Sequence, residues 1–134
     1  MESCIFCHIA KKKIPSEVIY EDKDLIAILD IAPVHLGHTL IISKKHYPNI
    51  LKTPEKILAK MVALGKKIGK KQLEALGAHG FNLTSNTHPA AGQSVMHVHF
   101  HIIPRYEKDG LKSWRQKKYK PGEAEKIAKK LQLN

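Results

Sequence analysis

The 134-residue chain is predicted to adopt an α+β fold with an antiparallel sheet. Two observations predict this class. Strand-like apolar runs fall into two groups, and one long helical pattern at residues 54–76 separates the groups. Within the second group, the stretch 97–102 alternates histidine with an apolar residue, which is the period of a strand with one core-facing side.

The first group of runs predicts a short helix, a hairpin and a third strand. Residues 25–29 form a nearly continuous apolar run, which is typical of a strand covered on both faces. Pro15 ends the preceding helix, and Pro33 and Gly37 interrupt the segment after the hairpin. We expect a helix at 4–12, strands at 18–21, 25–29 and 38–43, and an irregular connection at 30–37.

The long helix is predicted from an apolar stripe. Its members recur at helical spacing and include Ile57, Leu58, Met61, Val62, Leu64 and Ile68. Thr53 is the expected N-cap with Pro54 in the first helical position, and Gly77 is the expected stop. Gly65 and Gly69 would allow the helix to approach a sheet closely.

After the helix, strands are expected at 80–85 and 95–103. A polar, basic tail at 106–120 contains Trp114 and Tyr119, and a last helix should run from Pro121 to about Leu131. We interpret residues 1–134 as a single domain, with a core at about 4–105 and a C-terminal tail and helix at 106–134.

The composition limits the partners. The formal net charge is +11, from 23 Lys and Arg residues against 12 Asp and Glu residues, but only Arg105 and Arg115 are arginines. Lysine suits general solvation, whereas arginine dominates specific nucleic-acid readout, so we expect anionic small molecules and at most weak nucleic-acid binding. A lysine-rich solvated surface explains the charge equally well. No apolar run is long enough for a membrane span and no signal peptide is evident, which favours the cytoplasm.

The histidine stretch and the turn before it suggest an anion site. His97, His99 and His101 would form one row. Without any function, such a row would simply be the solvent-facing side of an amphipathic strand. The turn 86–94 contains Pro89 and Gly92 and delivers small donors to the start of this row. Such donors beside imidazoles would form a cradle for a phosphate.

These residues resemble the histidine triad (HIT) family of nucleotide hydrolases and transferases, most closely its Hint-like nucleoside phosphoramidase branch. The resemblance is carried by Gly92-Gln93-Ser94-Val95-Met96-His97-Val98-His99-Phe100-His101-Ile102-Ile103, supported by Asp30-Ile31-Ala32-Pro33, Gly37–His46 and the opening Cys4-Ile5-Phe6-Cys7. It implies five strands in one antiparallel sheet and a homodimer that joins two sheets edge to edge. It also implies cleavage of a P–N or P–O–P bond at the α-phosphate of a purine nucleotide.

The resemblance implies a role for each site residue. His99 would attack phosphorus and form a nucleotidyl-histidine intermediate, His101 would bind the α-phosphate, and His38 would support them. Ser94 would pass a proton to the leaving group, with Gln93 and Asn86 near the phosphate. Asp30 would bind the ribose hydroxyls, and a purine would lie among apolar side chains, namely Phe6, Ile9, Ile14, Ile28 and Ile31. Turn chemistry, capping and core packing are the ordinary explanations for these same residues.

A second group consists of Cys4, Cys7, His46 and His97. Two thiolates and two imidazoles suit tetrahedral Zn²⁺, and some bacterial and archaeal family members carry zinc at matching positions. We therefore expect a structural zinc ion, with free thiols as the alternative, and no cofactor for the chemical step. His97 would then have no catalytic role.

Several alternatives stay open. One alternative is a dinucleoside polyphosphate hydrolase, which would use the same nucleophile. Another is a basic nucleotide- or RNA-binding module, which would need no nucleophile. Two others are disfavoured: a metal-dependent hydrolase would need acidic ligands near the histidines, which this sequence does not offer, and the uridylyltransferase branch typically has glutamine at the position of His101. The chain departs from its branch at His88, where glycine is usual in a turn that needs positive φ, and in its tail after Arg105.

Overall fold

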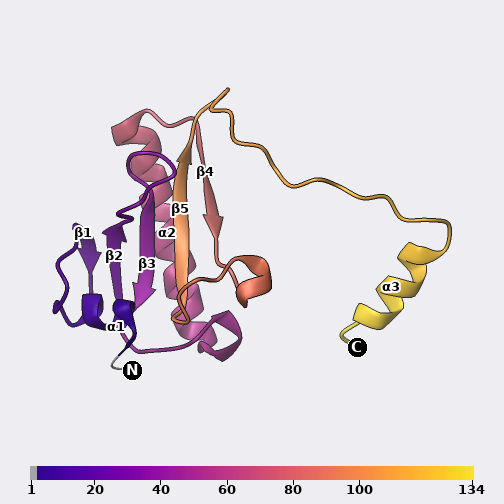
Figure 1. The fold of residues 1–134 in the computed structure, drawn as a ribbon, viewed down its shortest axis with the longest axis horizontal. Helices are drawn as coiled ribbons and strands as arrows, with labels where there is room; N and C mark the ends of the chain where they lie inside the picture. The colour runs from indigo at the N-terminus through magenta and orange to yellow at the C-terminus, as the bar shows by residue number, and fades with distance from the viewer. Residues whose placement is uncertain (1–2) are drawn as a thin grey trace.

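The computed structural model describes residues 3–134 and contains one five-stranded antiparallel sheet (Figure 1). The strand order is β1-β2-β3-β5-β4, so β1 and β4 form the two edges. The predicted α+β class, with one long helix and short helices at both ends, is confirmed. The elements in chain order are α1 (Ile5–Ala10), β1 (Val18–Glu21), β2 (Leu25–Leu29), β3 (Thr39–Ser43), η1 (Ile50–Lys52), α2 (Glu55–Leu76), β4 (Gly80–Thr84), η2 (Pro89–Ala91), β5 (His99–Arg105) and α3 (Glu123–Leu131).

The two faces of the sheet bury different side chains. Helix α2 covers one face, where its apolar stripe packs on alternate residues of the strands; the buried members are Leu25, Ala27, Ile41, Met61, Leu64, Ile68, Val98, Phe100 and Ile102. Helix α1 contributes to the smaller cluster on the other face, which consists of Phe6, Ile9, Ile26, Ile28, Leu40 and Ile42. Because β2 and β3 supply both clusters, their continuous apolar sequence is explained.

The glycines of α2 do allow a close approach to the sheet. A Cβ added at Gly69 would lie 2.4 Å from the Phe81 ring, and one at Gly65 would lie 2.5 Å from Leu83. Both contacts are shorter than van der Waals distance, so the packing between α2 and β4 depends on the missing side chains. Gly77 ends the helix in the left-handed conformation (φ +68°), as predicted.

The predicted N-cap of α2 is wrong. The helix begins at Glu55 with Pro54 in the cap position and no side-chain cap hydrogen bond. Thr53 instead ends the 3₁₀ turn η1, and its buried hydroxyl donates to the carbonyl oxygen of Asn49 at 2.7 Å. The Thr53 hydroxyl therefore bonds within the turn that precedes the helix, and Pro54, which has no side-chain acceptor, takes the cap position.

Several other boundaries differ from the predictions: α1 occupies Ile5–Ala10 rather than 4–12, β3 starts at Thr39, β4 ends at Thr84, α3 starts at Glu123, and β5 occupies His99–Arg105 rather than 95–103. For β5 the reason is pairing. His99 lies opposite Ile42, the penultimate residue of β3, and before it the Val98 N–H donates to the Tyr47 carbonyl instead of a strand. At the other end, Pro104 lies beyond the last residue paired with β3, where only β4 flanks the strand and a missing donor is tolerated.

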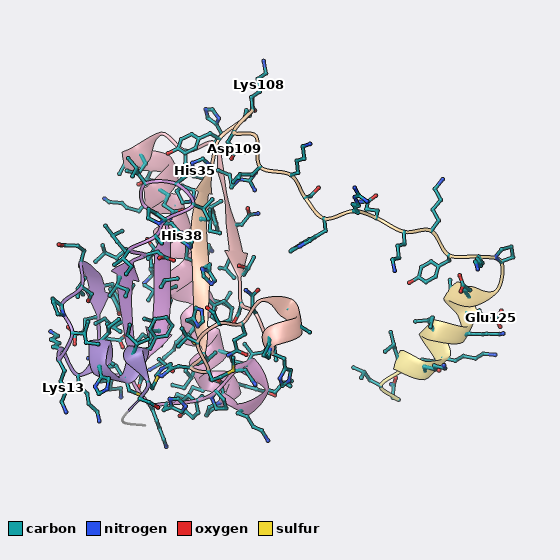
Figure 2. The ribbon with its side chains drawn as sticks, viewed as in Figure 1. Lys13, His35, His38, Lys108, Asp109 and Glu125 are labelled. Carbon is teal, nitrogen blue, oxygen red and sulfur yellow. The ribbon has the colours of Figure 1, made fainter. Side chains whose placement is uncertain are left out.

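The chain after β5 leaves the body of the molecule as an arm (Figure 1). Every residue from Gly110 to Asn134 is exposed, although residues 123–131 form the regular helix α3. Asp109 fixes the start of the arm, as labelled in Figure 2: it accepts hydrogen bonds from the Arg105 guanidinium, His35 Nε2 and the Leu111 N–H. No helix among residues 3–134 is both long enough and apolar enough to cross a membrane.

Candidate active site

The candidate site is built around the first residues of β5. His99 opens the strand and His101 follows two positions later, with ring centroids 5.0 Å apart. The ring of His97 is fully buried and turns toward Cys4 and Cys7 of the N-terminal segment. The histidine row predicted from the alternating pattern is therefore divided, with His99 and His101 in one group and His97 in another.

The tautomer of His99 is set by the main chain. Its Nδ1 lies 2.8 Å from the carbonyl oxygen of His97, an atom that only accepts hydrogen bonds. Nδ1 must therefore carry the proton, which leaves a free lone pair on Nε2 of the neutral ring. The Phe6 ring packs edge-on against this imidazole at a centroid distance of 4.9 Å. His99 is thus held as an oriented neutral base by a main-chain acceptor.

A chain of hydrogen bonds fixes His38 and His101. The Val34 N–H donates to Nδ1 of His38 at 3.1 Å, so the proton of a neutral His38 ring lies on Nε2. This Nε2–H donates to Nδ1 of His101, 3.0 Å away. His101 consequently carries its own proton on Nε2, where it can donate to a bound anion. One backbone amide thereby determines the donor of a ring two steps away.

Burial keeps these rings uncharged near neutral pH. It lowers the pKa of His101 to about 4, with further lowering by His99 and His38. Burial likewise lowers the pKa of His99 and of His38, and in both cases the Asp30 carboxylate opposes part of the effect. A neutral imidazole is a nucleophile and a protonated one is not, so the environment favours the reactive form.

Asp30 and the apolar side chains lie where β2 and α1 border this group. The Asp30 Oδ1 accepts from the Ala32 N–H at 2.9 Å, an Asx turn, and Oδ2 is 3.7 Å from Nε2 of His38. Among the five apolar residues expected around a purine, Phe6, Ile9 and Ile28 are buried in the smaller core cluster and Ile14 packs at its border. Ile31 is 94% exposed, which is unusual for a large aliphatic side chain with no role beyond packing.

Gln93 organises the loop before the strand. Its side chain is 4% exposed, and the amide donates to the carbonyl oxygens of Pro48 (2.6 Å) and Val95 (3.0 Å) while its oxygen accepts from the His88 N–H (2.7 Å). The Gln93 side chain therefore holds the main chain of this loop in place. Ser94, the next residue, is exposed.

The turn at His88 has the positive φ that its sequence position suggested. Its backbone lies at φ 72° and ψ 154°, a region that glycine populates readily and other residues seldom do. The loop holds this conformation by the Gln93 bond to its N–H and by the Ala91 N–H, which donates to its carbonyl. Asn86 closes the loop with a long 3.4 Å bond to the Gly92 carbonyl.

Cys4, Cys7, His46 and His97 converge on one point. Their Sγ and Nδ1 atoms all lie within 4.8 Å of one another, with individual separations of 3.1–3.5 Å where contacts form. Four ligands around a tetrahedral zinc ion are separated by about 3.3–3.8 Å, given metal–ligand bonds of about 2.0–2.3 Å. The four donor atoms therefore already have nearly the spacing that zinc requires.

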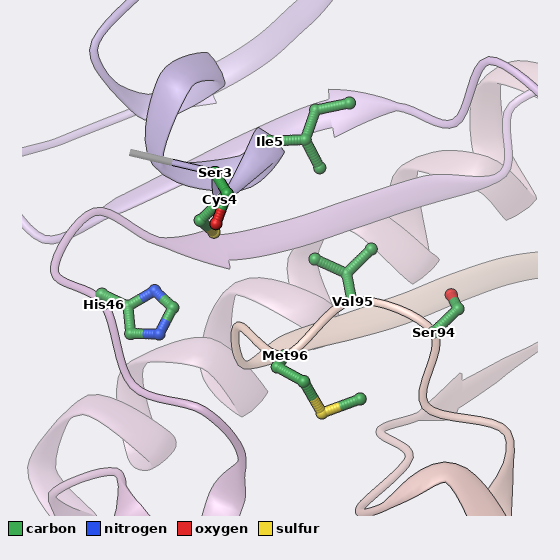
Figure 3. A pocket seen from close by; sticks show the side chains of 7 residues that line it. All are labelled: Ser3, Cys4, Ile5, His46, Ser94, Val95 and Met96. Atoms are coloured by element: carbon green, nitrogen blue, oxygen red, sulfur yellow. The ribbon is translucent and has the colours of Figure 1, made fainter. Parts of the chain in front are cut away.

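The protonation pattern of this cluster also fits a metal. Nε2 of His97 lies 2.7 Å from the Ser43 carbonyl and must donate to it, which leaves the Nδ1 lone pair facing the two sulfur atoms. Burial lowers the pKa of His97 to about 4, so the ring presents this lone pair over the physiological range. A cavity of about 390 Å³ borders the cluster (Figure 3); Cys4 and His46 line it with Ser94 and Met96, while His99 and His101 do not.

Two contributors to the site were not found from the sequence. Val34 acts through its N–H, which every residue except proline possesses, so no side-chain pattern could identify it. Ser43 orients His97 through its carbonyl oxygen and lies at the end of a strand whose apolar run gave no sign of this. Only the relation of these backbone groups to the histidine rings reveals their function.

Comparison with known proteins identifies the family in which this sheet and the pair His99 and His101 occur. Residues 11–108 match the model of the HIT domain. The chain belongs to the histidine triad (HIT) family. Proteins of the HIT family bind nucleotides and are in general nucleotide hydrolases. The resemblance inferred from the sequence is confirmed at this level.

Similar HIT proteins come from all three domains of life. An uncharacterized HIT-like protein of Methanocaldococcus jannaschii is 48% identical over 80% of this chain and 82% of its own. A protein of Arabidopsis thaliana named adenylylsulfatase is 43% identical over 81% of this chain and 55% of its own.

Two solved structures share the HIT fold. A Zn-bound histidine triad protein of Mycobacterium smegmatis superposes with a TM-score of 0.80 at 40% identity, covering 86% of this chain and 84% of its own. A HIT protein of Bacillus subtilis gives 0.87 at 37% identity, covering 96% and 94%.

Proposed function

We propose that this HIT protein hydrolyses purine nucleoside 5′-phosphoramidates, releasing an amine and the nucleoside monophosphate. The observation that carries the proposal is the orientation of His99, whose Nδ1–H is bonded to the His97 carbonyl so that Nε2 is free to attack. The orientation of His101 supports it, because the hydrogen-bond chain from Val34 through His38 leaves a donor on Nε2 of His101.

The reaction would proceed in two displacements. Nε2 of His99 attacks the α-phosphorus, the P–N bond breaks, and Ser94 passes a proton to the departing amine. Water then attacks the nucleotidyl-imidazole and returns a proton to Ser94, which gives the monophosphate and restores the neutral ring. Nε2–H of His101 donates to a phosphate oxygen throughout, and Asp30 takes the ribose hydroxyls. Asn86 and the loop ordered by Gln93 complete the phosphate side, while Phe6, Ile9, Ile14, Ile28 and Ile31 contact the base.

Two further elements belong to the proposal. Cys4, Cys7, His46 and His97 would hold one structural zinc ion, since their spacing and tautomers fit it and the similar M. smegmatis protein is described as Zn-bound. The zinc supplies stability and takes no part in the chemical step. The chain would act in the cytoplasm as a homodimer that joins two sheets by their edges.

A second candidate function differs from the first in its leaving group. A similar plant protein is named an adenylylsulfatase, so adenylyl sulfate is the specific competitor to a phosphoramidate. Hydrolysis of dinucleoside polyphosphates would also begin with attack by the His99 ring. Comparing kcat/KM for adenosine 5′-phosphoramidate, an aminoacyl adenylate, adenylyl sulfate and a dinucleoside tetraphosphate decides among them, with the phosphoramidate expected to be the best substrate.

The substitution His99→Ala tests the mechanism. We expect it to lower kcat for adenosine 5′-phosphoramidate at least about 10³-fold, because the ring that attacks phosphorus is removed. Circular dichroism should show an unchanged fold, and binding of the monophosphate should persist. His79→Ala, which removes a ring far along the chain from this group, is the control. Full turnover by the His99 variant would contradict the mechanism, as would failure to trap a nucleotidylated histidine in the wild-type protein.

A further inference from the structure

The C-terminal arm presents side chains that the rest of the described chain, residues 3–109, leaves exposed. All side chains from Gly110 to Asn134 are exposed, including Trp114 (90%), Tyr119 (69%) and Leu131 (70%). Helix α3 has nine residues, and isolated helices of this length are marginal in water. A short helix with an apolar stripe at Ile127 and Leu131 therefore indicates a surface that it packs against.

The beginning of the arm is held rigidly. Asp109, whose side chain is 6% exposed, accepts from the Arg105 guanidinium, from His35 and from the Leu111 N–H. The Arg105 guanidinium keeps the pKa of Asp109 far below its usual range, so these bonds persist at any physiological pH. They direct the chain away from the sheet past its β4 edge, as Figures 1 and 2 show. The arm is aimed outward by the structure and does not fold back.

The B. subtilis HIT structure supports a defined position for the arm. It superposes on 96% of this chain, a share that residues 3–109 alone cannot supply. An extended arm without contacts to its own body would not keep one position in a second protein unless something outside the body held it.

The β4 edge is suited to receive a second copy. β4 has no charged residue, proline or bulge, the devices that protect an edge strand from pairing, and it pairs on one side only. The other edge, β1, has a register shift between Val18 and Tyr20 and ends in Glu21, which pairs with Lys12 and Lys44. Pairing between two β4 strands related by a two-fold axis is thus the better way to join two sheets.

The reach of the arm then determines what α3 meets. Strands lie about 4.8 Å apart, so the partner's β1 would lie about 24 Å from the β4 edge of the first copy. Residues 110–120, fully extended, span up to about 36 Å. The arm can therefore cross the partner's whole sheet and place α3 at its outer edge.

The partner's outer edge matches α3 in polarity and charge. β1 exposes Val18 (44%), Ile19 (49%) and Tyr20 (41%) along the outer edge of the sheet, and the Tyr20 hydroxyl donates to the Asp22 carboxylate. Residues 17–24 contain four acidic residues and one lysine; Glu21 pairs with Lys12 and Lys44, Asp24 pairs with Lys60, and Glu17 is exposed. Residues 110–134 contain eight Lys or Arg residues and two Glu residues. An apolar stripe flanked by lysines would meet an apolar strip flanked by carboxylates.

We propose that the arm is exchanged between two copies of this chain, with α3 of each docking through Ile127 and Leu131 on β1 of the other. This inference rests on the sheet-to-sheet dimer given under the proposed function, and it adds the docking surface and its register. It does not depend on the reaction, because neither α3 nor β1 contributes a residue to the His99 site.

Amide hydrogen exchange of the full chain tests the docking. We expect α3 amides to be protected at least about tenfold in the dimer and to lose this protection on dilution to monomer. The double variant I127Q/L131Q should abolish the protection and raise the dimer dissociation constant about 10–100-fold. The control E125Q/K129Q also introduces two glutamines, but on the opposite face of the helix, where Lys129 lies 3.5 Å from Glu125. It should change neither the protection of the α3 amides nor the dimer dissociation constant.

Zero-length carbodiimide cross-linking of mixed ¹⁴N and ¹⁵N chains identifies the surface. Links between a lysine of residues 117–130 and an acid of residues 17–24 should carry both isotopes. A stable dimer with unprotected α3 would overturn the exchange and leave the dimer itself standing. Links confined to one chain, or α3 protection that appears only with added single-stranded RNA, would also overturn it. Because no readout measures turnover, failure of the proposed reaction would be seen separately.

Discussion

At the scale of single residues, main-chain groups decide which atom of each imidazole is reactive. The His97 carbonyl leaves Nε2 of His99 free, and the Val34 N–H gives His38 the proton that it donates to His101. The Ser43 carbonyl does the same for His97 and exposes its Nδ1 to the cysteines. His97, His99 and His101, which are evenly spaced in the sequence, therefore do not all present the same ring nitrogen as an acceptor.

The low pKa of His101 predicts how stability depends on pH. Unfolding returns this pKa from about 4 to its ordinary 6.5, so between these values the unfolded chain binds more protons. The free energy of unfolding should fall as pH drops from 6.5 to 4, with about 1–2 kcal/mol of the loss due to His101 after solvent screening. Urea unfolding of wild type and His101→Gln at both pH values measures it. An equal pH dependence in the two proteins would exclude the assignment.

The conformation of His88 predicts a stabilising substitution. A non-glycine residue in this region costs about 1–3 kcal/mol, whereas glycine adds about 0.5–1 kcal/mol of unfolded-state entropy. His88→Gly should therefore raise the free energy of unfolding by about 1 kcal/mol. His79→Gly, at a position without positive φ, serves as the control and should not stabilise the protein. A destabilised His88→Gly protein would mean that the imidazole makes a contact worth more than the strain.

At the scale of elements, α2 depends on atoms that are missing. Gly69→Ala adds a methyl group 2.4–2.6 Å from three atoms of the Phe81 ring, which must move against the sheet. We expect a loss of about 1–3 kcal/mol from overpacking, despite the helix propensity gained by about 1 kcal/mol. Gly80→Ala is the matched control, since a Cβ there meets nothing within 4 Å. Chemical denaturation compares them, and a Gly69 variant as stable as the control would refute the close approach.

The elements also show how far the sequence could be interpreted. Periodicity identified the strands and the long helix because burial on one face imposes a period on apolar residues. It failed at Thr53 and at the start of β5, where the outcome depends on hydrogen bonds outside the element: the Thr53 hydroxyl donates to the Asn49 carbonyl, and the Val98 N–H donates to the Tyr47 carbonyl. The division of the histidine row follows from this second contact. Residue types alone could name candidate members of the site but could not assign the tautomers of the histidines.

At the scale of the whole molecule, the cysteine–histidine cluster joins three distant parts of the chain. Cys4 and Cys7 belong to the N-terminal segment and α1, His46 follows β3, and His97 precedes β5. A zinc ion bound to all four would close long loops and fix α1, whose Phe6 packs on His99. Its removal should loosen the N-terminal segment and so reach the active site indirectly through that ring.

Metal analysis and chelation test this arrangement. Protein purified without chelators should contain about one zinc ion per chain, and stripping it should lower the thermal midpoint by several degrees, with recovery on adding zinc. Cys7→Ser should be destabilised and insensitive to chelator, because a ligand is already missing. The stripped protein should keep its rate constant for the chemical step wherever it stays folded, since the proposed attack by His99 uses no metal. Zinc-free protein with unchanged stability would show that the four side chains are held by packing alone, and zinc-dependent kcat at constant folded fraction would place the ion in the reaction.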